Sequence, residues 1–235
     1  MCLSHSSMPT RTRSSVGCMS DKYVVLWSGG FDSTYMIQHL LESQPEAEVE
    51  AHYIALRNNA LKTSAELTAV SAISLIFKAK FKERFWVKTP AFGDQIVAPS
   101  IAMESFSGNR LFYNNQMPLL LAALAACVSG NKTKAALGYV MHDGAISFLG
   151  EMRQIWQAYG IMMVGKWPEL VFPLAQYHKL GIAANLWPEL RALCTCCEVA
   201  DEERLPAVKF CGKCPPCRHN LEAGLILPAV QEYEL

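Results

Sequence analysis

Short apolar runs alternate along the chain with longer segments in which apolar residues recur at helical spacing. Five runs predict β-strands, at residues 23–27, 48–56, 85–89, 134–140 and 170–174. Helical patterns follow them, over residues 32–42, 62–82, 111–128, 148–159 and 179–185. Strands that alternate with helices favour a mostly parallel sheet with helices on both faces. The pattern therefore predicts a doubly wound α/β fold with a five-stranded, mostly parallel sheet.

The loop after the first predicted strand carries the clearest chemical signal. The apolar run enters Ser28-Gly29-Gly30-Phe31-Asp32-Ser33, and a helical pattern begins at once. Adjacent glycines let backbone N–H groups approach an anion, and the positive end of the following helix points at the same place. The lysine of a Walker loop is missing. The loop predicts a nucleotide phosphate site, and the competing interpretation is an ordinary Gly-rich turn.

Side chains at this predicted edge of the sheet are the candidate catalytic residues. Ser28 and Ser33 can add hydroxyl donors to phosphate, and Asp32 can hold the Mg²⁺ that accompanies ATP. Asp143, after the fourth predicted strand, is a candidate contact for the substrate or Mg²⁺. His142 beside it is a candidate proton acceptor for an incoming amine, or a structural or surface histidine.

The end of the second predicted strand is the expected adenine site. In a doubly wound sheet this end lies beside the phosphate loop. We therefore expect the backbone of Ile54, Ala55 and Leu56 to hold the base. Arg57 would then lie near the phosphates or the substrate, or it is a solvated strand end.

Six of the nine cysteines lie between Cys194 and Cys217. Cys211, Cys214 and Cys217 have C-x2-C-x2-C spacing, which lets successive sulfurs turn toward one ion. Zn²⁺ needs a fourth ligand, and Cys194, Cys196 and Cys197 are candidates. The pattern favours structural zinc, with an iron–sulfur cluster or reactive thiols as alternatives. Clustered cysteines also favour a metal site in a reducing cytoplasm over a disulfide framework.

Charge and segment composition narrow the class of protein. The 235 residues include 21 basic and 21 acidic side chains, so net charge gives no reason to expect a nucleic-acid partner. No apolar run is long enough to predict a membrane span.

The pattern of segments predicts three parts of the chain. Residues 1–20 are expected to form a disordered leader, residues 21–190 an ATP-binding α/β domain, and residues 191–235 a zinc knuckle with a C-terminal helix.

The two motifs together resemble the 7-cyano-7-deazaguanine synthase (QueC) family of the PP-loop ATP pyrophosphatases. S-G-G-F-D-S matches the pyrophosphate loop, and C-G-K-C-P-P-C after L-C-T-C-C-E matches the zinc knuckle. The resemblance favours Cys197 as the first zinc ligand, with Cys196 as second choice. It also implies substrate contacts for Asn109 and Arg110 of the G-N-R block, and for Lys179 after Phe172-Pro173-Leu174.

The resemblance implies an ATP-dependent carbon–nitrogen ligase that uses ATP, Mg²⁺ and Zn²⁺. Members adenylate the carboxylate of 7-carboxy-7-deazaguanine, release pyrophosphate, and use ammonia to form the amide and then the nitrile (preQ0) for queuosine biosynthesis. The family further implies a cytoplasmic homodimer.

Two departures from the family pattern keep other functions open. The family's D-C-R element after the fourth strand is missing, and G-R-N is altered to G-N-R. One alternative is a divergent enzyme that transfers the activated deazapurine to an amine on a protein or another molecule. Others are a tRNA-modifying PP-loop enzyme and a non-catalytic nucleotide-binding partner.

Overall fold

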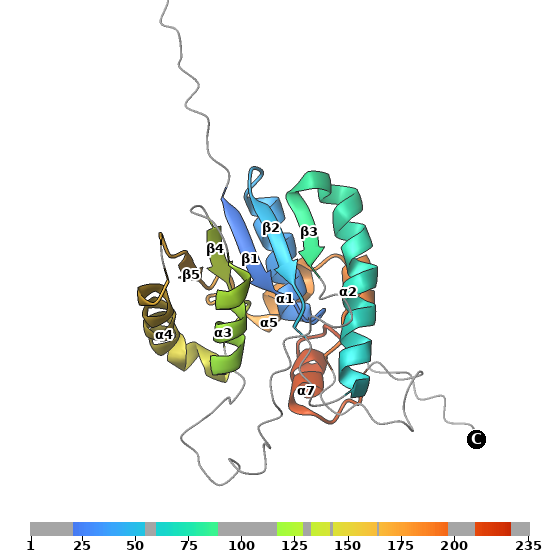
Figure 1. Ribbon diagram of the computed structural model, residues 1–235. Helices are drawn as coiled ribbons and strands as arrows, with labels where there is room; N and C mark the ends of the chain where they lie inside the picture. Colours follow the sequence, from blue (N-terminus) through green and yellow to red (C-terminus); the bar gives the residue numbers. More distant parts are fainter. Residues whose placement is uncertain are drawn as a thin grey trace, which may run out of the picture.

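Five parallel strands form a single sheet. The computed structural model describes residues 21–54, 60–88, 117–128, 133–141, 143–163, 165–196 and 210–226. The strands are β1 (Lys22–Leu26), β2 (Glu48–His52), β3 (Phe85–Lys88), β4 (Thr133–Ala136) and β5 (Glu169–Val171). Their order is β3-β2-β1-β4-β5, and every neighbouring pair is parallel (Figure 1). The predicted five-stranded, doubly wound α/β fold is confirmed.

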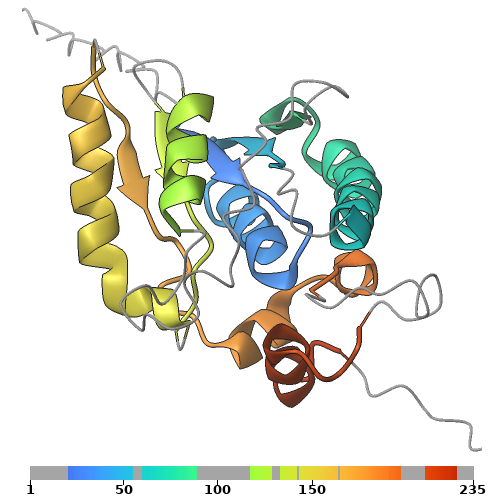
Figure 2. The same cartoon turned by 60° about the horizontal axis from the view of Figure 1, so that its bottom comes forward.

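Helices cover both faces of the sheet. One core contains side chains from α1 (Phe31–Ser43), α2 (Ala60–Phe81), α5 (Lys179–Asn185) and α6 (Pro188–Leu193). A second core contains side chains from α3 (Met117–Cys127) and α4 (Leu149–Ile161), which lie on the other side of the sheet (Figure 2). Short 3-10 turns, η1 (Lys82–Arg84) and η3 (Gly144–Phe148), precede β3 and α4. Helix α7 (Pro215–Glu222) lies beyond the end of the sheet toward which the strand arrows point (Figure 1).

The alternation of side chains along β1 explains why both faces are apolar. Tyr23 and Val25 point into the first core, whereas Val24 points into the second. At the end of β1, Trp27 packs against Phe77 and Phe85, and its indole N–H donates to the Thr34 hydroxyl at 3.0 Å. This bond holds the first turn of α1 against the end of β1.

Several element boundaries differ from the predicted ones. β4 ends at Ala136 instead of residue 140. The Leu137 N–H still donates to the Val171 carbonyl of β5 at 3.2 Å, but the chain then finds partners outside the sheet. The Met141 N–H, for example, donates to the Tyr177 carbonyl at 2.9 Å. β2 ends at His52, and residues 55–56 of the predicted second strand lie outside the described residues. Helix α6, with Pro188 in its first turn, is a helix that periodicity did not predict.

The C-terminal residues pack against the main core. Ala223, Leu225 and Ile226 are buried in the same core as α1 and α2. Arg191 of α6 donates to the backbone carbonyl of Leu225 at 2.9 Å, and also to that of Gly224. The division into domains at residue 190 therefore stays a prediction. In the described residues, every helix is too short or too polar to cross a lipid bilayer.

Candidate nucleotide site and cysteine cluster

The sheet places a cavity where its strand order reverses. β1 and β4 are neighbours, yet the helices that follow them pack on opposite faces, so a crevice opens at their carboxyl ends. A cavity of about 330 Å³ lies there. Its lining comes from the loop after β1 (Ser28, Gly30, Phe31, Asp32, Ser33), the segment after β4 (Leu137, Gly138, Tyr139, Asp143) and the end of β2 (Tyr53, Ile54). Small-molecule sites in doubly wound folds lie at this position.

Glycines allow the Ser28–Ser33 loop to pack closely against α2. Gly29 has a φ of +73°, and a Cβ atom there would lie 2.9 Å from the Cβ of Ala69 and 3.3 Å from the Glu66 carbonyl oxygen. Gly30 is the N-cap of α1 and supplies no side-chain cap to its first N–H groups. The Ser28 and Ser33 hydroxyls are 3.4 Å apart, a weak contact that phosphate oxygens can replace. The geometry is that of an anion site at a helix N-terminus.

Asp32 forms an ion pair with Lys179, a residue 147 positions away in the sequence. The pair joins the first turn of α1 to the first residue of α5, and both side chains line the cavity. Burial raises the pKa of the Asp32 carboxyl above its ordinary value, although Lys179 opposes that shift. The structure thus places the predicted catalytic Asp32 and the predicted substrate-binding Lys179 in one pair.

Three buried polar atoms that line this cavity have no hydrogen-bond partner within the described residues. They are Oδ1 of Asp32, the hydroxyl of Tyr139 and Oδ1 of Asn220. Buried polar atoms are nearly always paired in folded proteins, because an unpaired one keeps its desolvation cost. Their convergence on one cavity is what a site for a polar ligand requires.

Asp143 has both a structural contact and a place in the cavity wall. Its Oδ2 accepts a hydrogen bond from the Val140 N–H at 3.0 Å, which closes the turn after β4. Burial, together with the Asp143 charge, raises the pKa of Tyr139 to about 12. Asp143 and Tyr139 therefore form one polar wall, opposite the end of β2.

A third carboxylate, which the sequence did not single out, lies on the α2 side of the cavity. Glu66 and Lys62, one turn apart on α2, both line it. The Tyr53 hydroxyl donates to Glu66 Oε2 at 2.9 Å. Burial raises the pKa of Glu66, while Lys62 opposes that shift. The i, i+4 spacing of the two charges, just after the expected adenine strand, is the signal that could have found them.

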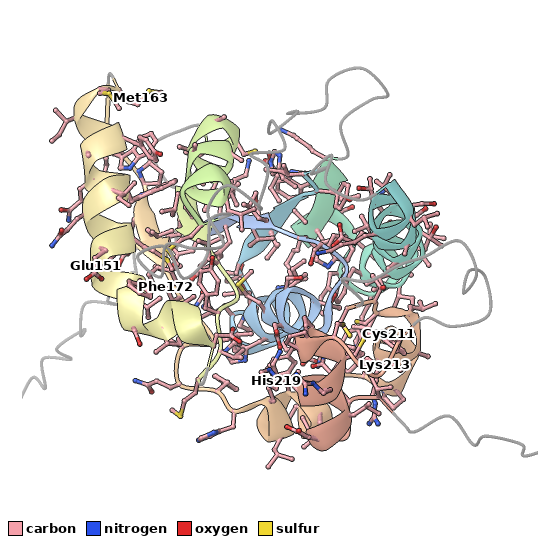
Figure 3. All side chains as sticks on the ribbon, turned by 90° about the horizontal axis from the view of Figure 1, so that it is seen from below. Glu151, Met163, Phe172, Cys211, Lys213 and His219 are labelled. Carbon is pink, nitrogen blue, oxygen red and sulfur yellow. The ribbon has the colours of Figure 1, made fainter. Side chains whose placement is uncertain are left out.

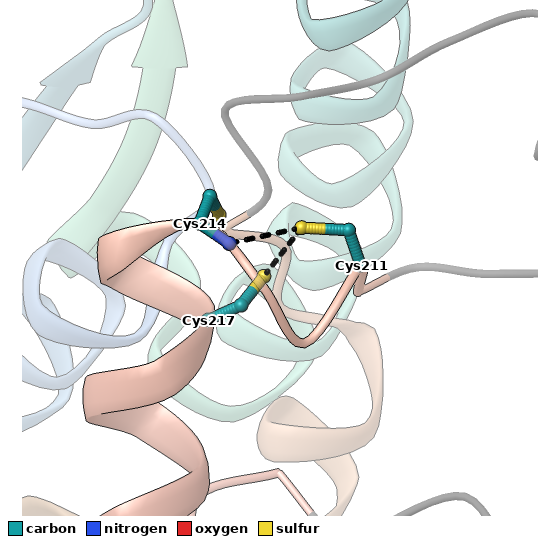
Figure 4. A group of neighbouring side chains, drawn as sticks. All are labelled: Cys211, Cys214 and Cys217. Carbon is teal, nitrogen blue, oxygen red and sulfur yellow. Dashed lines mark hydrogen bonds between the residues drawn. The ribbon is translucent and has the colours of Figure 1, made fainter.

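Three cysteine sulfurs gather at the start of α7. The Sγ atoms of Cys211, Cys214 and Cys217 all lie within 4.8 Å of one another, and we call these residues the cysteine cluster (Figure 4). Gly212, with a φ of +67°, makes the turn, and the Cys214 N–H donates to Cys211 Sγ at 3.3 Å. Burial raises the pKa of the Cys217 thiol, so a bound cation is needed to keep it as a thiolate.

Cys196 lies beside the cysteine cluster. Its Sγ is 3.8 Å from that of Cys217, and Cys211 Sγ is 3.9 Å from the same atom. Four sulfurs bound at about 2.3 Å to one tetrahedral ion lie about 3.8 Å apart, so these spacings fit a single Zn²⁺. In an iron–sulfur cluster each thiolate binds a different iron, which requires wider spacing. Cys197, the predicted first ligand, lies outside the described residues.

Basic residues lie close in the sequence to the cysteine cluster: Lys213 stands between Cys211 and Cys214, and Arg218 and His219 follow Cys217 directly. Figure 3 shows Cys211 and Lys213 on the turn before α7 and His219 on the helix itself, away from Glu151 of α4 and from Met163, which follows that helix. Positive charge near several thiolates offsets their mutual repulsion.

Residues that flank the cysteines also contact the Ser28–Ser33 loop. The Thr195 N–H donates to the Gly29 carbonyl at 3.0 Å. The ring of Phe210 stacks on that of Phe31, with centroids 5.9 Å apart. Cys196 itself lines the nucleotide cavity. The cysteine cluster and the loop are therefore one connected piece of structure.

The other predicted site residues divide into two groups. Ile54 lines the cavity, as the adenine prediction requires. The remaining ones lie outside the described residues: Ala55, Leu56, Arg57, Asn109, Arg110 and His142. Their roles stay predictions.

Comparisons with known proteins add little to what the geometry of the site indicates about its function. No family model and no curated protein matches the sequence. Nine chains of solved structures match it. One is the U34-tRNA thiolase NcsA from Methanococcus maripaludis with its [4Fe-4S] cluster, with a TM-score of 0.42 and 16% identity over 74% of this chain. This chain spans 57% of the length of that protein. A likeness of this extent supports no inference about activity.

Proposed function

We propose that this chain is an ATP-dependent enzyme that transfers AMP to a substrate carboxylate and releases pyrophosphate. The observation that carries the proposal is the Ser28–Ser33 loop at the switch point of the sheet, where it opens on a cavity whose polar atoms lack a partner among the residues that the structure describes. The loop offers N–H groups to the phosphates, and Lys179 adds positive charge beside it.

The residues of the loop have distinct roles in this reaction. The Ser28 and Ser33 hydroxyls and the N–H groups at the start of α1 bind the part of ATP that leaves as pyrophosphate. The unpaired Oδ1 of Asp32 is the atom that would hold Mg²⁺. Mg²⁺, when bound there, neutralises charge that develops on the leaving pyrophosphate. Lys179 moves from the Asp32 carboxylate to the phosphates as the nucleotide enters.

The far wall of the cavity fits a planar heteroaromatic acid. Leu120 and Leu137 give it apolar surface, while Tyr139, Asp143 and Asn220 offer polar atoms. A ring with N–H groups can donate to carboxylate and amide oxygens there. This chemistry, together with the family resemblance, supports 7-carboxy-7-deazaguanine or a close analogue as the acid. Ammonia, or an amine of another molecule, then attacks the acyl carbon of the adenylate, so that the carbon–nitrogen bond forms, the acyl C–O bond to AMP breaks, and AMP and a proton are released.

A tRNA-modifying reaction is the second candidate function, and one observation favours it. Cys196 belongs to the cavity wall and also lies 3.8 Å from Cys217 of the cysteine cluster. A cysteine that lines the cavity and lies beside the cysteine cluster could bring a thiol to an adenylated base, which is the chemistry this candidate requires.

Pyrophosphate release from ATP and Mg²⁺ tests these functions. We expect release by the full chain with 7-carboxy-7-deazaguanine and ammonia, and an amide or nitrile product by mass spectrometry. Release with the acid and a different amine would indicate the divergent ligase. Release only with tRNA would indicate the second candidate. Nucleotide binding without release under any of these conditions would overturn the enzymatic proposal and leave a nucleotide-binding partner.

A further inference from the structure

Glu66 lies on the wall of the cavity between the Ser28–Ser33 loop and the end of β2. Its backbone carbonyl would be 3.3 Å from a Cβ on Gly29, so this turn of α2 packs directly on the loop. Its carboxylate accepts a hydrogen bond from the hydroxyl of Tyr53, which lies just after the end of β2. Tyr53 is 2% exposed, which fixes its hydroxyl in place. Glu66 therefore spans the stretch between the expected phosphate site and Ile54 at the expected base site.

A nucleotide that bridges these two ends must place its sugar beside Glu66. Phosphates at the helix N-terminus and a base at the end of β2 leave the ribose between them. The wall in this part of the cavity is formed by Tyr53, Lys62 and Glu66. A carboxylate repels phosphate, so it does not suit the triphosphate itself, but it is a good acceptor for neutral hydroxyl groups.

The carboxylate of Glu66 has capacity left for such hydroxyls. A carboxylate offers about four lone-pair positions, and the Tyr53 hydroxyl takes one of them on Oε2. Burial raises the pKa of Glu66, whereas Lys62, one turn earlier on the same face of α2, and the Tyr53 hydroxyl favour its ionised form. An ionised carboxylate held by a buried tyrosine is a rigid acceptor, and rigidity is what discrimination between similar sugars requires.

We propose that Glu66 binds the ribose of the nucleotide by accepting hydrogen bonds from its 2′- and 3′-hydroxyls, so that the site selects ribonucleotides over 2′-deoxyribonucleotides. Tyr53 is a positioning residue that holds the carboxylate. This proposal rests on the proposed function in one respect, namely that the ligand of the cavity is a nucleotide.

Binding of ATP and 2′-deoxy-ATP to the full chain tests the proposal, measured by calorimetry with Mg²⁺ and without an acid substrate. We expect the unmutated chain to bind ATP about tenfold more tightly than 2′-deoxy-ATP, the effect of one lost hydrogen bond to a charged group. Glu66→Gln should weaken the binding of both nucleotides, because 2′-deoxy-ATP keeps its 3′-hydroxyl, but it should weaken ATP binding more. The preference for ATP should therefore fall from about tenfold to less than about threefold. Tyr53→Phe should reduce the preference for ATP without abolishing it, because the carboxylate remains but is no longer held by the Tyr53 hydroxyl. Glu151→Gln, an exposed carboxylate on α4 (Figure 3), is the matched control and should change neither affinity.

The outcomes separate this proposal from the proposed function. Equal binding of ATP and 2′-deoxy-ATP by the unmutated chain would overturn the ribose role of Glu66 while leaving nucleotide binding intact. An unchanged preference in folded Glu66→Gln protein would overturn it as well, and would leave Glu66 as a structural partner of Tyr53. Failure of the unmutated chain to bind any nucleotide would overturn both proposals. If Glu66→Gln does not fold, Tyr53→Phe decides the question: a reduced preference for ATP supports the role of the carboxylate that Tyr53 holds, and an unchanged preference overturns it.

Discussion

Asp32 is the residue on which the proposed reaction depends most. It offers an unpaired Oδ1 to the cavity and forms an ion pair with Lys179. Asp32→Asn keeps the size of the side chain but removes the charge that Mg²⁺ and Lys179 require. We expect pyrophosphate release to fall about 100-fold or more, a loss comparable to that of one key electrostatic group in an active site. Circular dichroism should show an unchanged fold, because Asp32 contributes no apolar side chain to the core.

The control for this substitution is a carboxylate in an ion pair elsewhere. Asp21 pairs with Lys134 at 2.6 Å, outside the lining of the cavity. Asp21→Asn should leave pyrophosphate release unchanged. If Asp32→Asn and Asp21→Asn behave alike, Asp32 has no special role in the reaction.

Gly29 is the position where the loop tolerates no side chain. Its φ of +73° disfavours any L-residue, and an added methyl group would lie 2.9 Å from the Cβ of Ala69. Gly29→Ala should lower the free energy of unfolding by about 1–3 kcal/mol, measured by urea denaturation. Gly150→Ala in α4 is the matched comparison, because an added Cβ there meets nothing within 4 Å. It should be neutral or stabilising by up to about 1 kcal/mol. Equal effects of the two changes would contradict the close packing at Gly29.

At the scale of elements, the cysteine cluster and the Ser28–Ser33 loop support each other. Thr195 bonds to Gly29, and Phe210 stacks on Phe31, so two chain segments that lead to the cysteines also hold the loop. We expect removal of the metal with a chelator to speed amide hydrogen exchange both in residues 211–217 and in the loop. Mass spectrometry with and without added Zn²⁺ measures this. Faster exchange confined to residues 211–217 would mean that the loop does not depend on the metal.

Cysteine substitutions separate metal binding from general damage to the core. Cys214→Ser removes one thiolate from the cysteine cluster, so bound zinc and thermal stability should both fall, because metal binding adds to the free energy of folding. Cys127→Ser, in α3, replaces a half-buried cysteine outside the cluster and should leave the zinc content unchanged. Atomic absorption and thermal melting measure the two quantities. Full zinc content in Cys214→Ser would contradict the ligand role.

For the whole molecule, local pattern was enough to predict the sheet but not the site. The apolar runs and the Gly-Gly turn after β1 are local features, and the five strands follow from them. The pairing of Asp32 with Lys179 depends on contact between segments 147 positions apart, which no local pattern encodes. For Glu66 the spacing with Lys62 is a local signal, but it does not distinguish a cavity carboxylate from an ordinary surface pair, and the contact with the Tyr53 hydroxyl appears only in the structure. β4 was predicted too long because its apolar residues continue into the cavity wall.

A charge network inside the sheet was also invisible in the sequence. Glu50 lies in the middle of β2 and is buried. The sequence around it predicts a strand but not that a charged side chain is buried within it. It contacts Lys22 of β1 at 2.5 Å, Lys88 of β3 at 2.7 Å, and His52 at 2.8 Å. One carboxylate thus ties three adjacent strands together. A buried charge without partners is strongly destabilising, so the network matters for the stability of the whole sheet.

The pH dependence of stability follows from this network. Burial alone would raise the pKa of Glu50, but hydrogen bonds from Lys22, Lys88 and His52 outweigh it and lower the pKa from 4.5 to about 2. The folded state therefore binds fewer protons than the unfolded state between these values. The stabilisation is fully present above about pH 4.5 and is lost as the pH falls toward 2. Because Lys88 is 59% exposed and screened by solvent, we expect the loss to be about 1–2 kcal/mol.

Glu50→Gln provides the decisive comparison, because it retains the shape of the side chain without the titrating group. Urea denaturation at pH 7, 4.5 and 2.5 should show that the unmutated chain loses about 1–2 kcal/mol more between pH 4.5 and 2.5 than Glu50→Gln does. Glu48→Gln, two residues earlier on β2, is the control and should keep the pH dependence of the unmutated chain. The Glu50→Gln protein should also be less stable at pH 7, because Lys22 and Lys88 then lose their charged partner. Identical pH profiles for Glu50→Gln and the unmutated chain would show that the acid sensitivity of the fold arises from other carboxylates.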